Sequence, residues 1–518
     1  MNTTFLRSPR PPSLARIAGV SLAGILVISI TFLALGRPVL AIGITLAFVA
    51  AFYLLFRPTY SRAFHLMILS LPFLAAFVID IGGNLRVPYY FAVIALGLGL
   101  YHSQLDVPRQ TLTLWFLGAF AIYALLSIAL TFQFAPPSAV ENFGFRTSQF
   151  RPLIQAGQLG LMLIFFYLTL NFIRSGEQLK LVSKLIIWSL ALVVAYGTYE
   201  VICTLTECSF INVNTNPDHI ENRFAGTQKL LSGEITIPRP RSILLEPLNL
   251  GIYILFSLPF AVAYLAYAKS GIVRWTILGI IALAGILFLL TWSRGAFIGM
   301  LLALAVALLL VSNLRTRLLI LVGCGVAYLA IALIVFPLLG SDSSIKAPAA
   351  MMYERLYTVV ELPTAIINGN ELSSNIGRPY NIPVSIFRDH ATLGVGLGNY
   401  PIALSEMTGV PLAASAPFSL HLEILTQFGI IGATFFYLFL GYVMYQLFRA
   451  TRNTQHPLRP FAVASLISII GVMTASAALG GLTTDGHLWV MLAIAVVIPT
   501  LMRDSVPSID PASEESQC

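Results

Sequence analysis

Charged residues are scarce in this sequence. Only 10% of its 518 residues are Asp, Glu, Lys or Arg, whereas a typical soluble domain has roughly 25%. The 22 acidic and 30 basic residues cannot cover the surface that water-soluble domains of this total length would expose. Because 57% of the residues are hydrophobic, we expect most of the chain to face lipid.

Cysteine is scarce as well, which limits the chemistry to be considered. The 4 cysteines have neither metal-ligand spacing nor a CxxC pair, so zinc and thiol chemistry have no support. Cys203 and Cys208 alone are close enough in sequence to suggest a disulfide, and the sequence leaves open whether it forms. The net charge of +8 comes from short basic clusters between apolar runs, a pattern that sets membrane orientation rather than one typical of nucleic-acid binding.

Long hydrophobic runs fill most of the chain. A membrane-spanning helix needs about 20 mostly apolar residues. The sequence therefore predicts an all-α, polytopic integral membrane protein with about 14 spans (roughly 12 to 14). The expected spans are residues 16–35, 39–56, 63–82, 87–102, 113–133, 153–173, 181–202, 244–267, 275–292, 295–312, 318–338, 419–447, 460–480 and 486–502.

The positions of Lys and Arg predict the orientation, because short cytoplasmic loops retain an excess of these residues. With the N-terminus inside, 17 of the 30 bases fall in short cytoplasmic segments. Eight of the others lie in two long loops, residues 204–243 and 339–418, where the rule has little force. Both termini are therefore expected to be cytoplasmic, and both long loops are expected on the outer face.

The chain is expected to divide along these boundaries. The predicted parts are N-terminal helices (1–203), a first outer loop (204–243), helices with a short hairpin (244–338), a large outer loop (339–418), C-terminal helices (419–504) and a disordered cytoplasmic tail (505–518). Long polar loops between spans are more often functional than decorative, so we expect the site on the outer face.

The segment PRPRSILLEPLN (residues 238–249) carries two arginines and a carboxylate from the first long loop into a helix. One interpretation is that Arg239 and Arg241 anchor the helix at lipid headgroups, while Glu246 is a first-turn acid favoured by the helix dipole. The alternative is that the arginines bind a phosphate bidentately and Glu246, at the start of an apolar run, acts as a base.

The segment TWSRGAF (residues 291–297) is a tight polar break between two strongly apolar helices. A turn whose arginine reaches toward the headgroups would explain it. However, the predicted topology places Arg294 in a short outer loop, where arginine is disfavoured, and its presence there suggests a function.

Two further polar segments border the end of the large loop. GVGLGNY (residues 394–400) superficially resembles a dinucleotide-binding loop, but no strand and helix with a downstream acid surround it. We expect its glycines to let the backbone approach another helix or a bound sugar closely. PFSLHLEILTQFGIIG (residues 417–432) places His421 at the outer end of an apolar helix, where a lone histidine is usually a structural hydrogen-bonding residue.

Together these segments resemble the bacterial O-antigen ligases and polysaccharide polymerases that act on undecaprenyl-diphosphate-linked glycans. The resemblance covers roughly residues 239–440 and rests on the order of the arginine-to-EP segment, the SRGAF hairpin, GVGLGNY, and FS followed by GIIG. It implies a many-helix enzyme of the bacterial inner membrane with a periplasmic site and no metal or other cofactor. It also implies transfer of a glycan from its lipid diphosphate to an acceptor hydroxyl, with inversion at the anomeric carbon.

The resemblance suggests roles for individual residues. Arg241 and Arg294 match the family's diphosphate-contacting arginines, Arg378 resembles a further one, and Arg239 is an additional candidate. The candidate substrate-positioning residues are Asn249, Ser293 and Asn399.

One departure from the family leaves the catalytic base open. The family commonly has a histidine where this sequence has Phe418. His421 lies one turn further on and shares a helix face with that position, while Glu246 and His390 are the other candidates. Glu246 ranks first, because the EP form of the first segment is more typical of exopolysaccharide polymerases than of ligases.

We therefore predict a membrane glycosyltransferase that polymerises O-antigen or exopolysaccharide repeat units. Its expected partners are a lipid-linked donor, a glycan or lipid-linked acceptor, membrane lipids and export-complex proteins. The alternatives are a ligase acting on a lipid A-core acceptor, a transporter of polysaccharide or lipid-linked glycan, and an export scaffold. A transporter would place ionisable residues around a midplane cavity. The clearest ionisable candidates here are instead expected near outer helix ends: Glu200, Glu246, Arg294 and His421.

Overall fold

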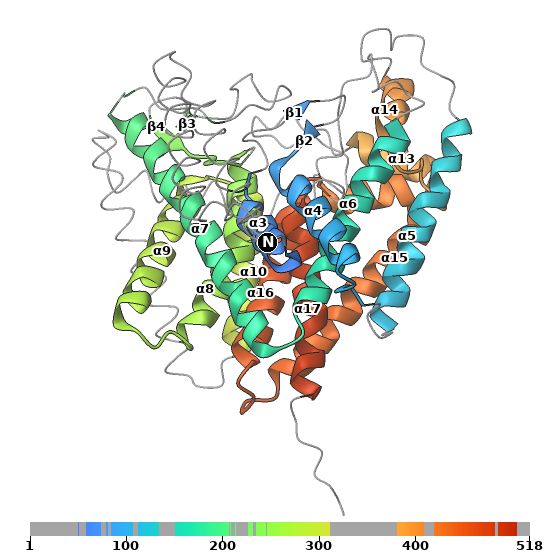
Figure 1. Ribbon diagram of the computed structural model, residues 1–518. Coiled ribbons are helices and arrows are strands. Elements are labelled where there is room, and N and C mark those ends of the chain that lie inside the picture. Colours follow the sequence, from blue (N-terminus) through green and yellow to red (C-terminus); the bar gives the residue numbers. More distant parts are fainter. Residues whose placement is uncertain are drawn as a thin grey trace, which may run out of the picture.

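The computed structural model shows a bundle of apolar helices with two small antiparallel hairpins at one end (Figure 1). It describes residues 50, 59–73, 79–80, 84–106, 112–133, 151–206, 208, 213, 226–230, 235–244, 246–310, 317, 381–408, 419–481 and 485–504.

Among the described residues, 8 helices are long and apolar enough to cross a membrane, which confirms the predicted polytopic α-helical membrane protein. They are α5 (Leu112–Leu126, continued by the 3₁₀ turn Ser127–Gln133), α6 (Arg151–Phe172), α7 (Gly176–Leu205), α8 (Pro247–Leu265), α9 (Gly271–Leu290), α15 (Leu420–Thr451), α16 (Arg459–Ala475) and α17 (Gly486–Asp504).

The remaining elements are shorter. They are the apolar helices α4 (Val87–Tyr101) and α10 (Arg294–Leu310), the helices α3 (Tyr60–Ser70), α13 (Asn381–Asp389) and α14 (Tyr400–Thr408), the 3₁₀ turn η5 (Ser476–Ala478), and the pairs β1 (Ile79–Asp80) with β2 (Asn84–Leu85) and β3 (Gly226–Leu230) with β4 (Ile235–Arg239).

Most of the predicted spans coincide with helices, and one does not. The expected helix over residues 63–82 is wrong in its second half, because α3 ends at Ser70 and β1 begins at Ile79. Pro72 explains the end of α3, since proline has no backbone N–H and disfavours helical geometry in the residue before it. The predicted spans 16–35, 39–56 and 318–338 lie outside the described residues, apart from residue 50.

Close packing in the centre of the bundle depends on small residues. Gly299 of α10 faces Gly471 of α16 so closely that a Cβ atom on Gly299 would collide with the carbonyl oxygen of Gly471. Gly251 of α8 likewise packs against Ala296 of α10. Small residues let membrane helices approach each other closely, so α8, α10 and α16 form one tight group.

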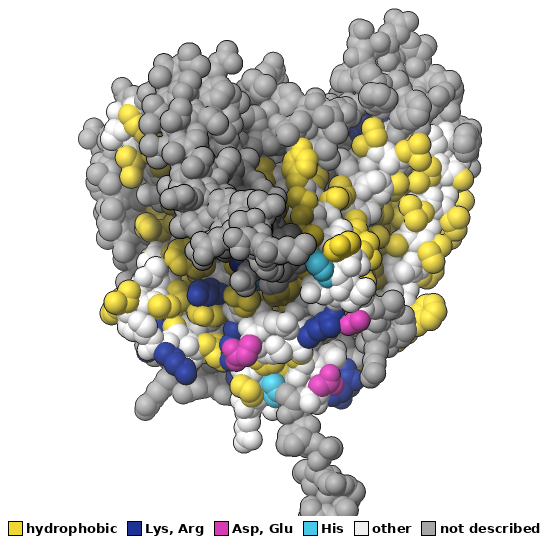
Figure 2. All heavy atoms as spheres, in the orientation of Figure 1, with side chains coloured by type: hydrophobic (Ala, Val, Ile, Leu, Met, Phe, Trp, Pro, Cys, Tyr) yellow, Lys and Arg dark blue, Asp and Glu magenta, His cyan; other side chains and the backbone are white. Residues whose placement is uncertain are grey.

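Apolar and charged side chains occupy different parts of the surface of the bundle. Large apolar side chains such as Trp115, Trp275 and Leu309 are exposed, as expected for a surface in contact with lipid. On the face shown in Figure 2, charged side chains of the described residues gather toward the lower end. The hairpins, α13 and α14 lie at the opposite, upper end in Figure 1.

Candidate active site

The first arginine segment and the SRG hairpin meet in the structure. Arg239 ends strand β4, and its Nε atom donates a hydrogen bond to the carbonyl oxygen of Thr291 at 3.0 Å. Thr291 is the buried C-cap residue of α9, at the start of the hairpin. Two polar segments 52 residues apart in sequence are thereby joined at one point.

The hairpin itself is held by local hydrogen bonds. The backbone N–H of Ser293 donates to Oγ1 of Thr291 at 3.3 Å, and Oγ of Ser293 accepts the N–H of Ala296 at 3.4 Å. Ser293 therefore caps α10 and leaves Arg294, which is half-buried, as the first residue of that helix. A helix N-terminus and a guanidinium both favour an anion, so their coincidence at Arg294 suits a phosphate group.

Arg241 lies on a turn that is fastened to α7 by a buried carboxylate. The Oε2 atom of Glu200 accepts the backbone N–H of Arg241 at 3.1 Å and that of Ser242 at 2.8 Å. Glu200 is 3% exposed and Arg241 5% exposed. Sequence reasoning identified Glu200 only as an ionisable residue near a helix end. The sequence feature that could have singled out Glu200 is that it is a lone carboxylate in the last turns of an apolar helix.

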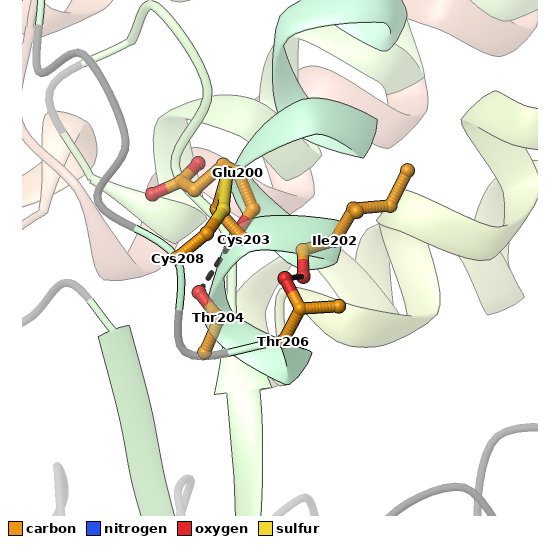
Figure 3. The surroundings of a disulfide bond; sticks show 6 residues. All are labelled: Glu200, Ile202, Cys203, Thr204, Thr206 and Cys208. Atoms are coloured by element: carbon orange, nitrogen blue, oxygen red, sulfur yellow. Dashed lines mark hydrogen bonds between the residues drawn. A yellow bond between two sulfur atoms is a disulfide. The ribbon is translucent and has the colours of Figure 1, made fainter.

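A disulfide closes the C-terminal end of α7. Cys203 and Cys208 are joined, which answers the question that the sequence left open. The N–H of Cys208 also donates to the carbonyl oxygen of Cys203 at 3.0 Å, and Oγ1 of Thr204 donates to the carbonyl oxygen of Glu200 at 2.8 Å. Figure 3 shows the disulfide beside Glu200 in the last turns of this helix.

Glu246 and Asn249 lie at the start of α8. Glu246 is the half-buried N-cap residue, and Pro247 follows it at the first helical position, where a missing N–H costs nothing. The carbonyl oxygen of Glu246 accepts the N–H of Leu250 at 3.1 Å. Asn249 is buried on the same helix. Glu246 thus lies only five residues after Arg241 in the sequence.

The glycine-rich segment packs against a break in α15. Gly429 has φ 60° and ψ −165°, which interrupts that helix. The N–H groups of Val395 and Gly396 donate at 2.8 Å to the carbonyl oxygens of Thr426 and Gln427, which the break would otherwise leave without partners. Of the two predicted purposes for these glycines, close approach to a helix is therefore confirmed.

The side chain of Asn399 supports this joint. Its Nδ2 atom donates to the carbonyl oxygen of Val395 at 2.8 Å, and its Oδ1 atom accepts the hydroxyl of Thr131 at 3.1 Å. Asn399 is fully buried, so its contacts are those of a structural residue. Next to it, burial raises the pKa of the Tyr400 hydroxyl to about 12.

Both ring nitrogens of His421 lie within hydrogen-bonding distance of a partner, one further along α15 beyond the break and one on α16. Nδ1 lies 2.7 Å from the hydroxyl of Tyr437, and Nε2 lies 3.0 Å from the carbonyl oxygen of Met473. Because a carbonyl can only accept, Nε2 carries the proton and Nδ1 accepts from Tyr437 in the neutral ring. This geometry favours a structural role for His421.

The remaining two predicted site residues are His390 and Arg378. His390 follows α13, where its backbone N–H donates to the carbonyl of Ile386 at 3.1 Å and its carbonyl accepts the N–H of Gly394 at 2.8 Å. Arg378 lies outside the described residues. No group of three or more His, Cys, Asp and Glu residues suited to hold a metal occurs in the part of the chain that the structure describes.

A second buried polar cluster was missed by sequence reasoning. The N–H of Gly481 donates to Oε2 of Glu423 at 2.8 Å, and a Cβ atom on Gly481 would lie 2.8 Å from Cγ of Asp485. Electrostatic interactions connect buried Arg86 with His487, whose ring nitrogens have no hydrogen-bond partner among the described residues. Only Glu423 belonged to a segment that the sequence singled out.

Comparison with known protein families identifies the matched part of the chain. The family described as O-Antigen ligase matches residues 278–437. The chain contains an O-antigen ligase family domain. No curated protein matches this chain.

The O-antigen ligase match begins within α9 and ends within α15, so it includes the SRG hairpin and the glycine-rich joint. The family consists of membrane glycosyltransferases of the ligase and polymerase type, which act on lipid-linked glycans. Residues 239–277, which the sequence resemblance also included, lie before the matched segment. The structure connects them to it through the hydrogen bond from Arg239 to Thr291.

Proposed function

We propose that this protein polymerises O-antigen or exopolysaccharide repeat units carried on undecaprenyl diphosphate at the periplasmic face of the bacterial inner membrane. The observation that carries the proposal is the junction of Arg239 with Thr291, which brings the Arg241 segment and the Arg294 hairpin into one structural unit. Guanidinium groups are well suited to bind a diphosphate bidentately.

The chemistry needs little more than charge stabilisation and alignment. The oxygen of the acceptor hydroxyl forms a bond to the anomeric carbon, the bond from that carbon to the diphosphate oxygen breaks with inversion, and the hydroxyl proton passes to a base. Negative charge develops on the leaving diphosphate. Arg241 and Arg294, fixed before the reaction, stabilise that charge without reorganisation, and Arg378 and Arg239 are further candidates for the same role.

Glu246 is our first candidate for the base. It lies at the N-terminus of α8, five residues from Arg241, whereas the ring nitrogens of His421 are directed at Tyr437 and Met473. His390 is the second candidate. Alignment of two lipid-tethered substrates supplies part of the rate enhancement through positioning, so the demand on the base is modest.

The proposed orientation has cytoplasmic termini. The hairpins, α13, α14 and the Cys203–Cys208 disulfide belong to the ends that we assign to the periplasm, where disulfides persist. Arg174 lies in the short connection between α6 and α7, and Lys180 lies near the start of α7, in keeping with a cytoplasmic side.

The proposal is tested by supplying purified protein with a lipid-linked repeat unit alone. Release of undecaprenyl diphosphate together with longer lipid-linked glycans would support a polymerase. A ligase, the second candidate, would leave the repeat unit unchanged until a lipid A-core acceptor is added. A transporter would move the glycan lipid across a vesicle membrane without releasing diphosphate.

A further inference from the structure

One carboxylate oxygen accepts two consecutive backbone N–H groups at the turn that carries Arg241. Oε2 of Glu200 is 3.1 Å from the nitrogen of Arg241 and 2.8 Å from that of Ser242. Both partners are buried, so neither N–H group has water as an alternative. These two hydrogen bonds of Glu200 hold the backbone of the turn that carries Arg241.

The same turn is attached to α7 at two further positions. Oγ of Ser242 donates to the carbonyl oxygen of Val193 at 2.7 Å, and the Cβ atom of Ser242 lies 3.4 Å from the place of a Cβ on Gly197. Positions 193, 197 and 200 share one helix face, because they are separated by four and three residues. One face of α7 therefore forms a cradle for residues 241–242.

The backbone conformation of the turn needs this support. Ser242 has φ 57°, in the left-handed region that residues other than glycine rarely adopt. Such a conformation persists only where the surroundings hold it. The N–H groups of Arg241 and Ser242 donate to Glu200, and the hydroxyl of Ser242 donates to the carbonyl oxygen of Val193. These contacts hold Ser242 in that conformation.

We propose that Glu200 is a positioning residue for the glycan transfer, holding the turn at Arg241 and Ser242 so that the guanidinium of Arg241 meets the leaving diphosphate. The inference rests on the proposed function. It adds a residue outside the matched family segment that acts only through Arg241. The disulfide from Cys203, three residues further along α7, fastens the adjoining chain to the same turn of helix.

The test compares Glu200→Ala and Glu200→Gln with the wild type at equal membrane abundance. Alanine removes the acceptor, and a misplaced catalytic group can cost about 10²-fold in rate, so we expect kcat to fall by roughly that factor with little change in the KM for the donor. Glutamine keeps an acceptor oxygen for both N–H groups and should restore most of the loss. Glu177→Ala, on an exposed position of the same helix, is the matched control and should match the wild type.

Two readouts separate positioning from other roles. If Glu200 acts through Arg241, the double variant Glu200→Ala with Arg241→Lys should be no slower than Arg241→Lys alone. Hydrogen exchange of peptides covering residues 236–244 should rise in Glu200→Ala and stay near wild type in Glu200→Gln. The proposal would be overturned if the rate losses of the two single variants multiplied in the double variant. It would also be overturned if Glu200→Ala were slow while hydrogen exchange of residues 236–244 stayed at the wild-type level.

These outcomes also distinguish this inference from the proposed function. If the wild-type protein releases no undecaprenyl diphosphate, the proposed function fails, while hydrogen exchange still reports whether Glu200 holds the turn. If the wild type is active and both Glu200 variants are equally active, only the positioning role fails.

Discussion

The guanidinium of Arg239 donates from Nε to the carbonyl oxygen of Thr291 at 3.0 Å, at the junction of strand β4 and the end of α9. This single contact connects a segment outside the O-antigen ligase match with the hairpin inside it. It is the structural reason to consider Arg241 and Arg294 as parts of one site.

The break in α15 should tolerate only glycine. Gly429 adopts φ 60° and ψ −165°, and a Cβ atom there would collide with the backbone at Thr392 and Gly394. Gly429→Ala should therefore lower the thermal stability of the purified protein by more than the ~1 to 3 kcal/mol typical of backbone strain alone.

The matched control for this substitution lies on the same helix. Gly441 has open space around it, and Gly441→Ala should leave the melting temperature unchanged or slightly higher. Equal melting temperatures for the two variants, measured in the same detergent, would show that the glycine joint is not strained.

The proposed periplasmic orientation of the site predicts that both long loops are accessible from outside the cell membrane. With Cys324 and Cys518 replaced by serine and the disulfide retained, Ile220→Cys and Asn370→Cys should each react with a membrane-impermeant thiol reagent in spheroplasts. Glu177→Cys, at an exposed position in the first turn of α7, should react only after lysis. The reverse pattern would place the proposed site in the cytoplasm.

Polymerase and ligase functions predict different products in a deletion strain. Loss of a polymerase should leave single repeat units on the lipid carrier, because units are made but not joined. Loss of a ligase should leave long, unattached polymer. Mass analysis of the accumulated lipid-linked glycans decides between them, and we expect the single units.

His421 should matter for stability more than for chemistry. His421→Ala would remove the partners of the Tyr437 hydroxyl and of the Met473 carbonyl, at a cost of about 1 to 3 kcal/mol for buried groups left unpaired. Tyr437→Phe should cost less, because it removes one of these hydrogen bonds. Turnover of His421→Ala, measured at equal abundance, should remain within about tenfold of wild type. A well-folded but inactive variant would identify His421 as catalytic.

Much of the fold could be predicted because membrane spans have a simple signal. Helices such as α8 and α17 follow from runs of about 20 apolar residues. The failure at residues 63–82 came from counting hydrophobicity across Pro72, whose effect is on the backbone rather than on hydropathy.

The site could be predicted only in part, because its contacts are long-range. Arg294 is conspicuous in the sequence as an arginine in a short turn that the charge pattern predicts on the outer face. Glu200 is not, since its partners are backbone N–H groups 41 and 42 residues away that no side-chain pattern encodes. The proximity of Arg86 and His487 could likewise not be predicted, because these residues are far apart in sequence and come together only when the helices pack.

The central claim is that Arg241 and Arg294 stabilise the leaving diphosphate. The most direct measurement is the rate of undecaprenyl diphosphate release from a purified lipid-linked donor by Arg241→Lys and Arg294→Lys at equal abundance. Lysine cannot replace a bidentate guanidinium, so each rate should fall by about 10² to 10³. Arg388→Lys, at an exposed position of α13, is the control and should remain near wild type. Near wild-type rates for both lysine variants, with an inactive His421→Ala, would contradict the account.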